Sequence, residues 1–116
     1  MVSKKELFYF TNEDGTMSQK INFRNDSQDG LSTFHFPDGS LDQETEFSNG
    51  RPNGIKIYYR GIHKVKNIST WRFGKRNGEQ TIFDSLGTAS LNIIFKQRNR
   101  NAIVAVALPF DRINDI

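Results

Sequence analysis

Apolar residues recur in register along this chain with a period of 24 residues. The stretch FSNGRPNGIKIYY at 47–59 returns imperfectly as WRFGKRNGEQTIF at 71–83. Written in rows of 24, the chain has three columns whose members are all apolar or aromatic: Phe10, Phe34, Tyr58, Ile82 and Val106; Met17, Leu41, Val65, Ala89 and Ile113; and Phe23, Phe47, Trp71 and Phe95. A fixed period of this length indicates a stack of similar supersecondary units.

Each unit contains two stretches in which apolar and polar residues alternate, separated by turn residues, which is the pattern of a β-hairpin. In the first unit, Met17, Ile21 and Phe23 alternate with polar residues such as Lys20 and Arg24. One face of the sheet is therefore expected to form the core and the other to meet solvent. The predicted strands are 7–11, 18–25, 31–36, 41–48, 54–60, 65–73, 79–84, 88–96 and 102–108.

Two kinds of glycine turn are predicted, because glycine adopts the positive φ that tight hairpins require. One kind lies within a unit and the other joins successive units. The clearest examples are Asp14-Gly15 and Asp38-Gly39 within units, and Asn53-Gly54 and Asn77-Gly78 between them. His63 stands where the other units have a turn glycine, so a turn of different shape is predicted there.

The pattern predicts a single-domain, all-β protein: an antiparallel meander of about nine strands with one face buried under aromatic residues. The units are approximately 8–31, 32–55, 56–79 and 80–103, followed by a C-terminal strand and cap at 104–116. Residues 104–108 are uncharged and would be a hazardous free edge. The segment 109–116, with Phe110, Ile113 and Ile116, is expected to cover that edge.

The composition narrows the class of protein. The 116 residues are 35% hydrophobic and include 10 Phe and no Cys. Burial must therefore depend on aromatic residues, and disulfides, thiolate nucleophiles and cysteine-ligated zinc are excluded. The N-terminus lacks the apolar run of a signal peptide, and no stretch is apolar enough for a membrane-spanning helix. We expect a cytoplasmic protein whose net charge of +3 permits, without requiring, an anionic partner.

The repeated unit resembles the MORN (membrane occupation and recognition nexus) repeat. The resemblance rests on the Asp-Gly turn, the aromatic residue at Phe47 or Trp71, and the stretches GRPNG and GKRNG followed by an alternating strand. It covers roughly residues 8–103 and is strongest to the bacterial variant of the repeat, many of whose members are antitoxins or immunity proteins. The resemblance implies a function in binding and neutralising a cognate protein toxin, for which a nuclease is one candidate.

Two groups of residues are candidates for binding a partner. The first is a stripe on the face opposite the predicted core, and exposed aromatic rows of this kind are typical of contact surfaces. The second is an acidic ridge, suited to the basic cleft of a nuclease. The alternatives are that the stripe forms a second core layer and that the ridge pairs with neighbouring cations. The stripe comprises Tyr9, His35, Ile57, Tyr59 and Phe83, and the ridge Asp42, Glu44 and Glu46.

A third group of residues is basic and is expected to line one rim of the sheet, in the loops that join units. These side chains are free to meet phosphate or carboxylate, or simply keep the sheet edges soluble. The group comprises Arg51, Lys75, Arg76, Arg98 and Arg100. Through it, the chain could act instead as a non-catalytic adaptor on anionic lipid or nucleic acid.

Catalysis finds little support in the sequence. The two histidines, His35 and His63, show no metal-ligand spacing, and no glycine-rich phosphate loop leads into a helix. We therefore expect no enzymatic activity, no metal, no cofactor and no small-molecule substrate. The leading hypothesis is a bacterial immunity protein or antitoxin, and the alternative is the adaptor.

Overall fold

The structure is a computed structural model that describes residues 3–61, 64–99 and 102–109. These residues form one antiparallel sheet and no helix. The strands are β1 Lys5–Thr11, β2 Met17–Arg24, β3 Ser27–Gln28, β4 Gly30–His35, β5 Leu41–Ser48, β6 Arg51–Gly61, β7 Lys64–Arg72, β8 Lys75–Phe83, β9 Ala89–Asn99 and β10 Ala102–Pro109.

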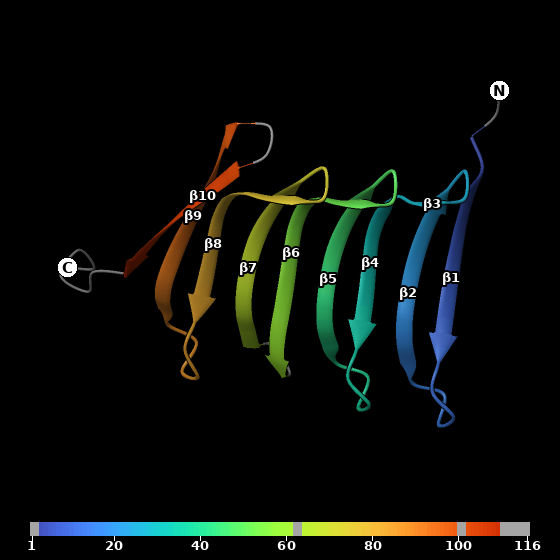
Figure 1. The fold of residues 1–116 in the computed structure, drawn as a ribbon. Helices are drawn as coiled ribbons and strands as arrows, with labels where there is room; N and C mark the ends of the chain where they lie inside the picture. Colours follow the sequence, from blue (N-terminus) through green and yellow to red (C-terminus); the bar gives the residue numbers. More distant parts are fainter. Residues whose placement is uncertain (1–2, 62–63, 100–101, 110–116) are drawn as a thin grey trace.

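The strands pair in chain order, β1-β2-β4-β5-β6-β7-β8-β9-β10, with the short β3 paired to β2. Figure 1 shows them side by side from β1 to β10, so that the sheet is open and its two ends lie far apart. The predicted all-β meander is confirmed, with β3 as an additional short strand. No helix in the described part of the chain is long and apolar enough to cross a membrane.

The turns within units lie where the sequence predicts them. Gly15 and Gly39 have φ values of +88° and +90°. In the first turn the main-chain N–H of Gly15 donates to the carbonyl of Asn12, and the Asp14 carboxylate accepts from Thr16. That hydroxyl bond lowers the pKa of Asp14. In the third unit, Gly61 pairs with Lys64; the two residues between them, His63 included, lie outside the described residues.

The turns between units differ from the prediction. Each consists of two residues with positive φ, which is typical of a type I′ hairpin; the three pairs are Asn25-Asp26, Asn49-Gly50 and Phe73-Gly74. The prediction that Asn53-Gly54 and Asn77-Gly78 form these turns is therefore wrong. Both dipeptides lie inside strands, β6 and β8. The Asn53 side chain accepts a bond from the Phe73 N–H at 3.0 Å and so links one turn to the next unit.

Gly30, Gly54 and Gly78 are bulge residues instead, with φ values of +96°, +118° and +88°. The bulges beside Gly54 and Gly78 each shift the strand pairing by two residues. An even shift leaves every side chain on its own face, whereas a shift of one residue exchanges the faces. Figure 1 shows the ends of the hairpins β5–β6 and β7–β8 bending away from the direction of the strands.

Strand pairing sorts the side chains onto two faces. We call the first the aromatic face; it carries two of the predicted apolar columns, Phe10, Phe34, Tyr58 and Ile82, and Phe23, Phe47, Trp71 and Phe95. The second, which we call the charged face, carries in order of pairing Tyr9, Lys20, Thr33, Glu44, Ile57, Ile68, Thr81, Asn92 and Leu108. The prediction that the remaining column shares the aromatic face is wrong: after one-residue shifts its members pair with Thr11, His35, Tyr59 and Phe83, so they lie on the opposite face; they are Met17, Leu41, Val65 and Ala89.

Val106 departs from its predicted column. It pairs with Ile94 and so lies on the charged face, while Ala105 pairs with Phe95 on the aromatic face. The reason is the irregularity between Ala102 and Ile103, which shifts the pairing by one residue and so exchanges the faces. The last member of the second column, Ile113, and the predicted cap beyond Pro109 lie outside the described residues.

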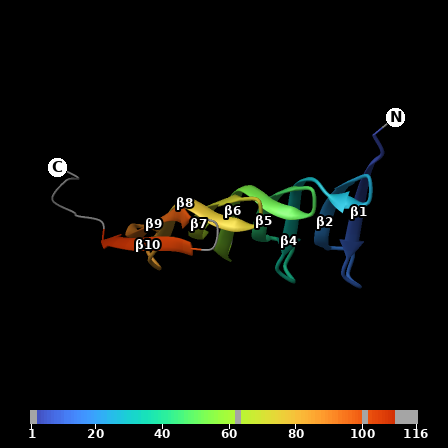
Figure 2. The same ribbon diagram turned by 45° about the horizontal axis from the view of Figure 1, so that its top comes forward.

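The aromatic face is not buried as expected. Among the described residues no hydrophobic side chain is buried, and the buried residues are Ser32, Thr33, Thr45, Ser69 and Gln80. The chain exposes 8328 Å², against roughly 6,500 Å² for a globular protein of its mass. Figure 2 shows a single layer with no other described element over either face. The cause is architectural, since each aromatic row has only its own sheet to pack against.

We predict that Gly54→Ala destabilises the sheet. A Cβ at this position would meet the Glu46 side chain, and φ of +118° is unfavourable for alanine. The free energy of unfolding should fall by about 1–3 kcal/mol, measured by urea denaturation. Gly61→Ala is the matched control, because a Cβ there meets nothing within 4 Å. Equal unfolding midpoints for the two variants would contradict the assignment of Gly54 as a strained bulge.

Candidate binding surfaces

The acidic ridge of β5 lies on the charged face. Glu44 pairs between Thr33 and Ile57, and its carboxylate accepts a short hydrogen bond from the Tyr59 hydroxyl. Burial of the phenol raises the pKa of Tyr59 to about 12, aided by the hydrogen bond to Glu44 and by its negative charge. Glu44 is thus held by its neighbour, whereas the Glu46 side chain is exposed.

Glu46 occupies a place where the first and third units have a hydrogen-bond donor and the fourth has Ile94. Asn22, Glu46 and Thr70 each lie against the bulge glycine of the next strand, namely Gly30, Gly54 and Gly78. The Asn22 amide donates to the carbonyl of Leu31, and the Thr70 hydroxyl donates to that of Glu79 at 3.2 Å. An ionised carboxylate has no proton to donate. Glu46 is therefore a locally unfavourable residue at a structurally repeated position.

The predicted aromatic stripe is discontinuous. Tyr9 is 54% exposed on β1, but the register places Lys20, Thr33 and Glu44 between it and Ile57. His35 is held by Thr33 Oγ1 at 2.9 Å and by the carbonyl of Gly39 at 3.0 Å. Ile57 and Tyr59 share β6, whereas Phe83 lies on β8, with β7 between the two strands; all three side chains are partly buried.

The predicted basic rim is divided between two places. Arg51 and Lys75 line a pocket of about 550 Å³ together with Arg72, Phe73 and Asn77. The Arg76 side chain instead lies over the aromatic face, with its guanidinium carbon 5.5 Å from the centroid of Trp71 and 5.3 Å from that of Phe95. The side chain of Arg98 and the whole of Arg100 lie outside what the structure describes.

A pocket on the aromatic face was missed by the sequence reasoning. Its volume is about 300 Å³, and its lining residues are Lys56, Tyr58, Lys66, Asn67, Ser69, Trp71, Arg76 and Gln80. We call it the basic-aromatic pocket. The repeat contained a signal for it, because Ser32, Lys56 and Gln80 form one 24-residue column and Thr45 and Ser69 another. Polar columns between apolar ones mark the floor of a groove.

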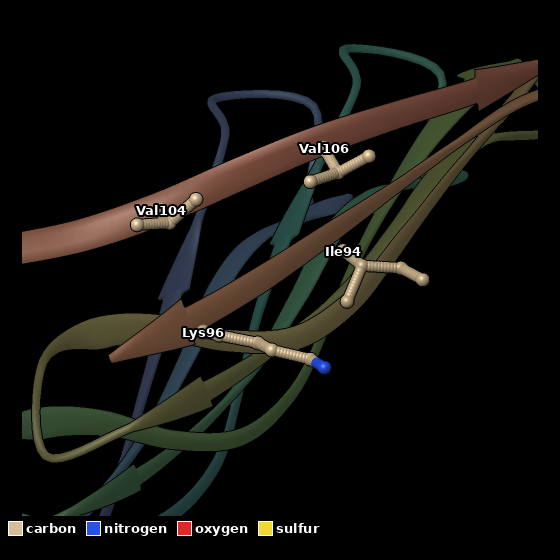
Figure 3. Close-up of a pocket in the computed structure, with 4 residues that line it drawn as sticks. All are labelled: Ile94, Lys96, Val104 and Val106. Atoms are coloured by element: carbon tan, nitrogen blue, oxygen red, sulfur yellow. The ribbon is translucent and has the colours of Figure 1, made fainter. Parts of the chain in front are cut away.

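A further pocket of about 440 Å³ lies at the C-terminal edge, lined by Ile94, Lys96, Val104 and Val106. Figure 3 shows these side chains on β9 and β10, with the Lys96 amine extending away from the two valines. Val106 is 50% exposed. The edge that sequence analysis expects to be covered is therefore apolar and open among the described residues.

The described residues contain no group of three or more His, Cys, Asp or Glu side chains that could hold a metal ion. Comparison of the chain with known protein families, curated proteins and solved structures finds no match. The candidate surfaces must therefore be interpreted from their own chemistry.

We predict that the pairing of Tyr59 with Glu44 makes stability depend on pH at the alkaline end. The folded-state pKa of Tyr59, about 12, lies above the ordinary value of 10.0. The folded protein therefore retains the phenol proton that the unfolded chain loses, and the free energy of unfolding should decrease as pH rises from 10 to 12. Tyr59→Phe should flatten this decrease, measured by urea denaturation across that range, while the control Tyr9→Phe should retain it. An unchanged slope in Tyr59→Phe would contradict the assignment.

Proposed function

We propose that the chain is a non-catalytic immunity protein or antitoxin, which binds and neutralises a protein toxin on its charged face. One observation carries the proposal: the sheet has two uncovered faces and no buried hydrophobic side chain among the described residues. Apolar surface left open on this scale is typical of proteins that contact a partner. The resemblance of the repeat to the bacterial MORN variant supports a toxin as that partner.

The charge of the ridge supports a basic partner. Asp42, Glu44 and Glu46 alternate along β5 and share one face. Glu46 is the most informative, because the fold itself favours a donor at that position, as in Asn22 and Thr70. Residues that oppose local stability are typical of functional sites. A carboxylate there is explained if a cation of the partner meets it.

The proposal is tested by co-expression with the product of the neighbouring gene. We expect the chain to co-purify with that product and to protect cells from its toxicity. Glu46→Gln should raise the free energy of unfolding by about 0.5–1.5 kcal/mol, because the amide can donate to the Ile55 carbonyl as Asn22 does to that of Leu31. The same variant should weaken capture of the partner.

Glu79→Gln is the matched control. Glu79 is exposed on the same face as Glu46, and the substitution removes the same negative charge. Its effects on the free energy of unfolding and on capture of the partner should both be smaller than those of Glu46→Gln. A neighbour that is harmless and fails to co-purify would count against the function. A Glu46→Gln variant that is more stable and still captures the partner fully would remove the ridge from the interface.

A second candidate function is that of an adaptor on anionic lipid or nucleic acid. The observation that favours it is the rim pocket, where Arg51, Arg72 and Lys75 converge. Binding to vesicles containing phosphatidylserine, or to oligonucleotides, should then weaken steeply with salt. Arg51→Glu with Arg72→Glu should abolish it in a sedimentation assay, while Lys20→Glu with Lys64→Glu, away from the rim, should not. Equal binding by both double variants would exclude the rim pocket as the site that binds lipid or nucleic acid.

A further inference from the structure

We propose that the basic-aromatic pocket is a second recognition site, which takes an aspartate or glutamate side chain from an extended acidic segment of a partner protein. The pocket lies on the aromatic face, opposite the acidic ridge. The pocket is therefore expected to bind a negatively charged group, whereas the ridge is expected to bind a positively charged one. The inference does not depend on the toxin assignment.

Three cationic residues line the pocket, Lys56, Lys66 and Arg76, and two of them, Lys56 and Arg76, lie over aromatic rings. The Lys56 ammonium lies 5.0 Å from the centroid of Tyr58 and 5.4 Å from that of Trp71, and Arg76 lies over Trp71 and Phe95. Strands β6 and β8 flank β7, so the two cations approach Trp71 from the strands on either side. Contact with the rings orients both side chains before any ligand arrives, which lowers the entropic cost of binding.

The positive charge of the pocket is not neutralised by the described residues. No carboxylate lines the pocket, and the ion pairs within the described part of the chain join Lys4 to Glu6 and Arg24 to Asp29. The guanidinium of Arg76 has one contact with the floor, to Gln80 Oε1 at 3.3 Å. A guanidinium has five N–H donors in a geometry that matches a carboxylate. The pocket therefore offers donors for an anion.

Asn67 adds a second, independent indication of a ligand. Its side-chain oxygen is buried and has no hydrogen-bond partner, although it belongs to the residues that line the pocket. The neighbouring floor group is satisfied, since Trp71 Nε1 donates to Ser69 Oγ at 2.8 Å. A buried acceptor without a donor is costly and calls for an explanation. The occupant should therefore supply an N–H or O–H donor beside its anionic group.

A peptide carboxylate fits these requirements better than a nucleotide. Single-stranded nucleic acid is bound by stacking its bases on open aromatic rings, whereas Tyr58, Trp71 and Phe95 each already carry a cation. A volume of about 300 Å³ is at the small end of ligand sites. It accommodates one acidic side chain, whose own main-chain N–H is the donor for Asn67. Tyr, Trp and Arg together are also the residue types that dominate protein interfaces.

The test uses the full chain and a fluorescein-labelled peptide of alternating glutamate and serine, with a glutamine–serine peptide as the neutral probe. Binding is followed by anisotropy and by the fluorescence of Trp71, the single tryptophan of the chain. Lys56→Gln combined with Arg76→Gln should weaken binding of the acidic peptide by at least about tenfold, or 1.4 kcal/mol. Lys20→Gln combined with Lys96→Gln removes the same charge outside the pocket and should leave the affinity unchanged.

Equal losses in the two double variants, or no preference for the acidic over the neutral peptide, would overturn the proposal. Tighter binding of a labelled oligothymidylate that is lost with Lys56 and Arg76 would assign the pocket to nucleic acid instead. If the glutamine variant is poorly folded, Lys56→Glu with Arg76→Glu replaces it, and preference for a lysine–serine peptide would support the assignment. Toxin capture depends on the opposite face, so each proposal can fail alone.

Discussion

The continuous antiparallel ladder of main-chain hydrogen bonds holds this protein together, because no other interaction runs from one end of the described sheet to the other. A typical domain buries apolar side chains between two layers, but here the described strands form one layer. Cohesion between neighbouring strands comes from the ladder and from cross-strand side-chain contacts. An example is the edge-to-face pair of Phe8 and Phe23, with ring centroids 5.4 Å apart. The register of the ladder is therefore the constraint on which everything else depends.

The bulge glycines preserve that register from unit to unit. Each two-residue shift, beside Gly54 and again beside Gly78, keeps the aromatic residues of successive units on one face. A one-residue shift exchanges the faces, and at the shift between Ala102 and Ile103 valines therefore appear among the charged residues. The apolar edge at β10 thus follows from one local irregularity in pairing, not from a change in the composition of the repeat.

An uncovered sheet makes the same residues serve stability and recognition. On the charged face, Glu44 is bound to Tyr59, while Glu46 faces a bulge that is satisfied in other units by Asn22 or Thr70. On the aromatic face, Lys56 and Arg76 stabilise the rings of the third unit and also concentrate positive charge there. The acidic ridge and the basic-aromatic pocket consequently present opposite charges on opposite faces, which suits them to different ligand groups.

The 24-residue period was enough to predict the meander, the strands to within a few residues and the aromatic column of Phe23, Phe47, Trp71 and Phe95, because hydrophobic alternation is a local property of the chain. It could not distinguish a turn from a bulge at Asn53-Gly54, since both require positive φ. Nor could it show that Lys20 and Glu44 separate Tyr9 from Ile57. It also could not show that Arg76 lies over Trp71 instead of at the rim, or that the side-chain oxygen of Asn67 lacks a hydrogen-bond partner. Those features depend on the pairing of strands and on the direction of each side chain. The sequence by itself determined the alternation of side chains within each strand. Only the tertiary structure decided how the strands pair, and that no second layer of described residues covers the sheet, because register and burial depend on what packs against a residue.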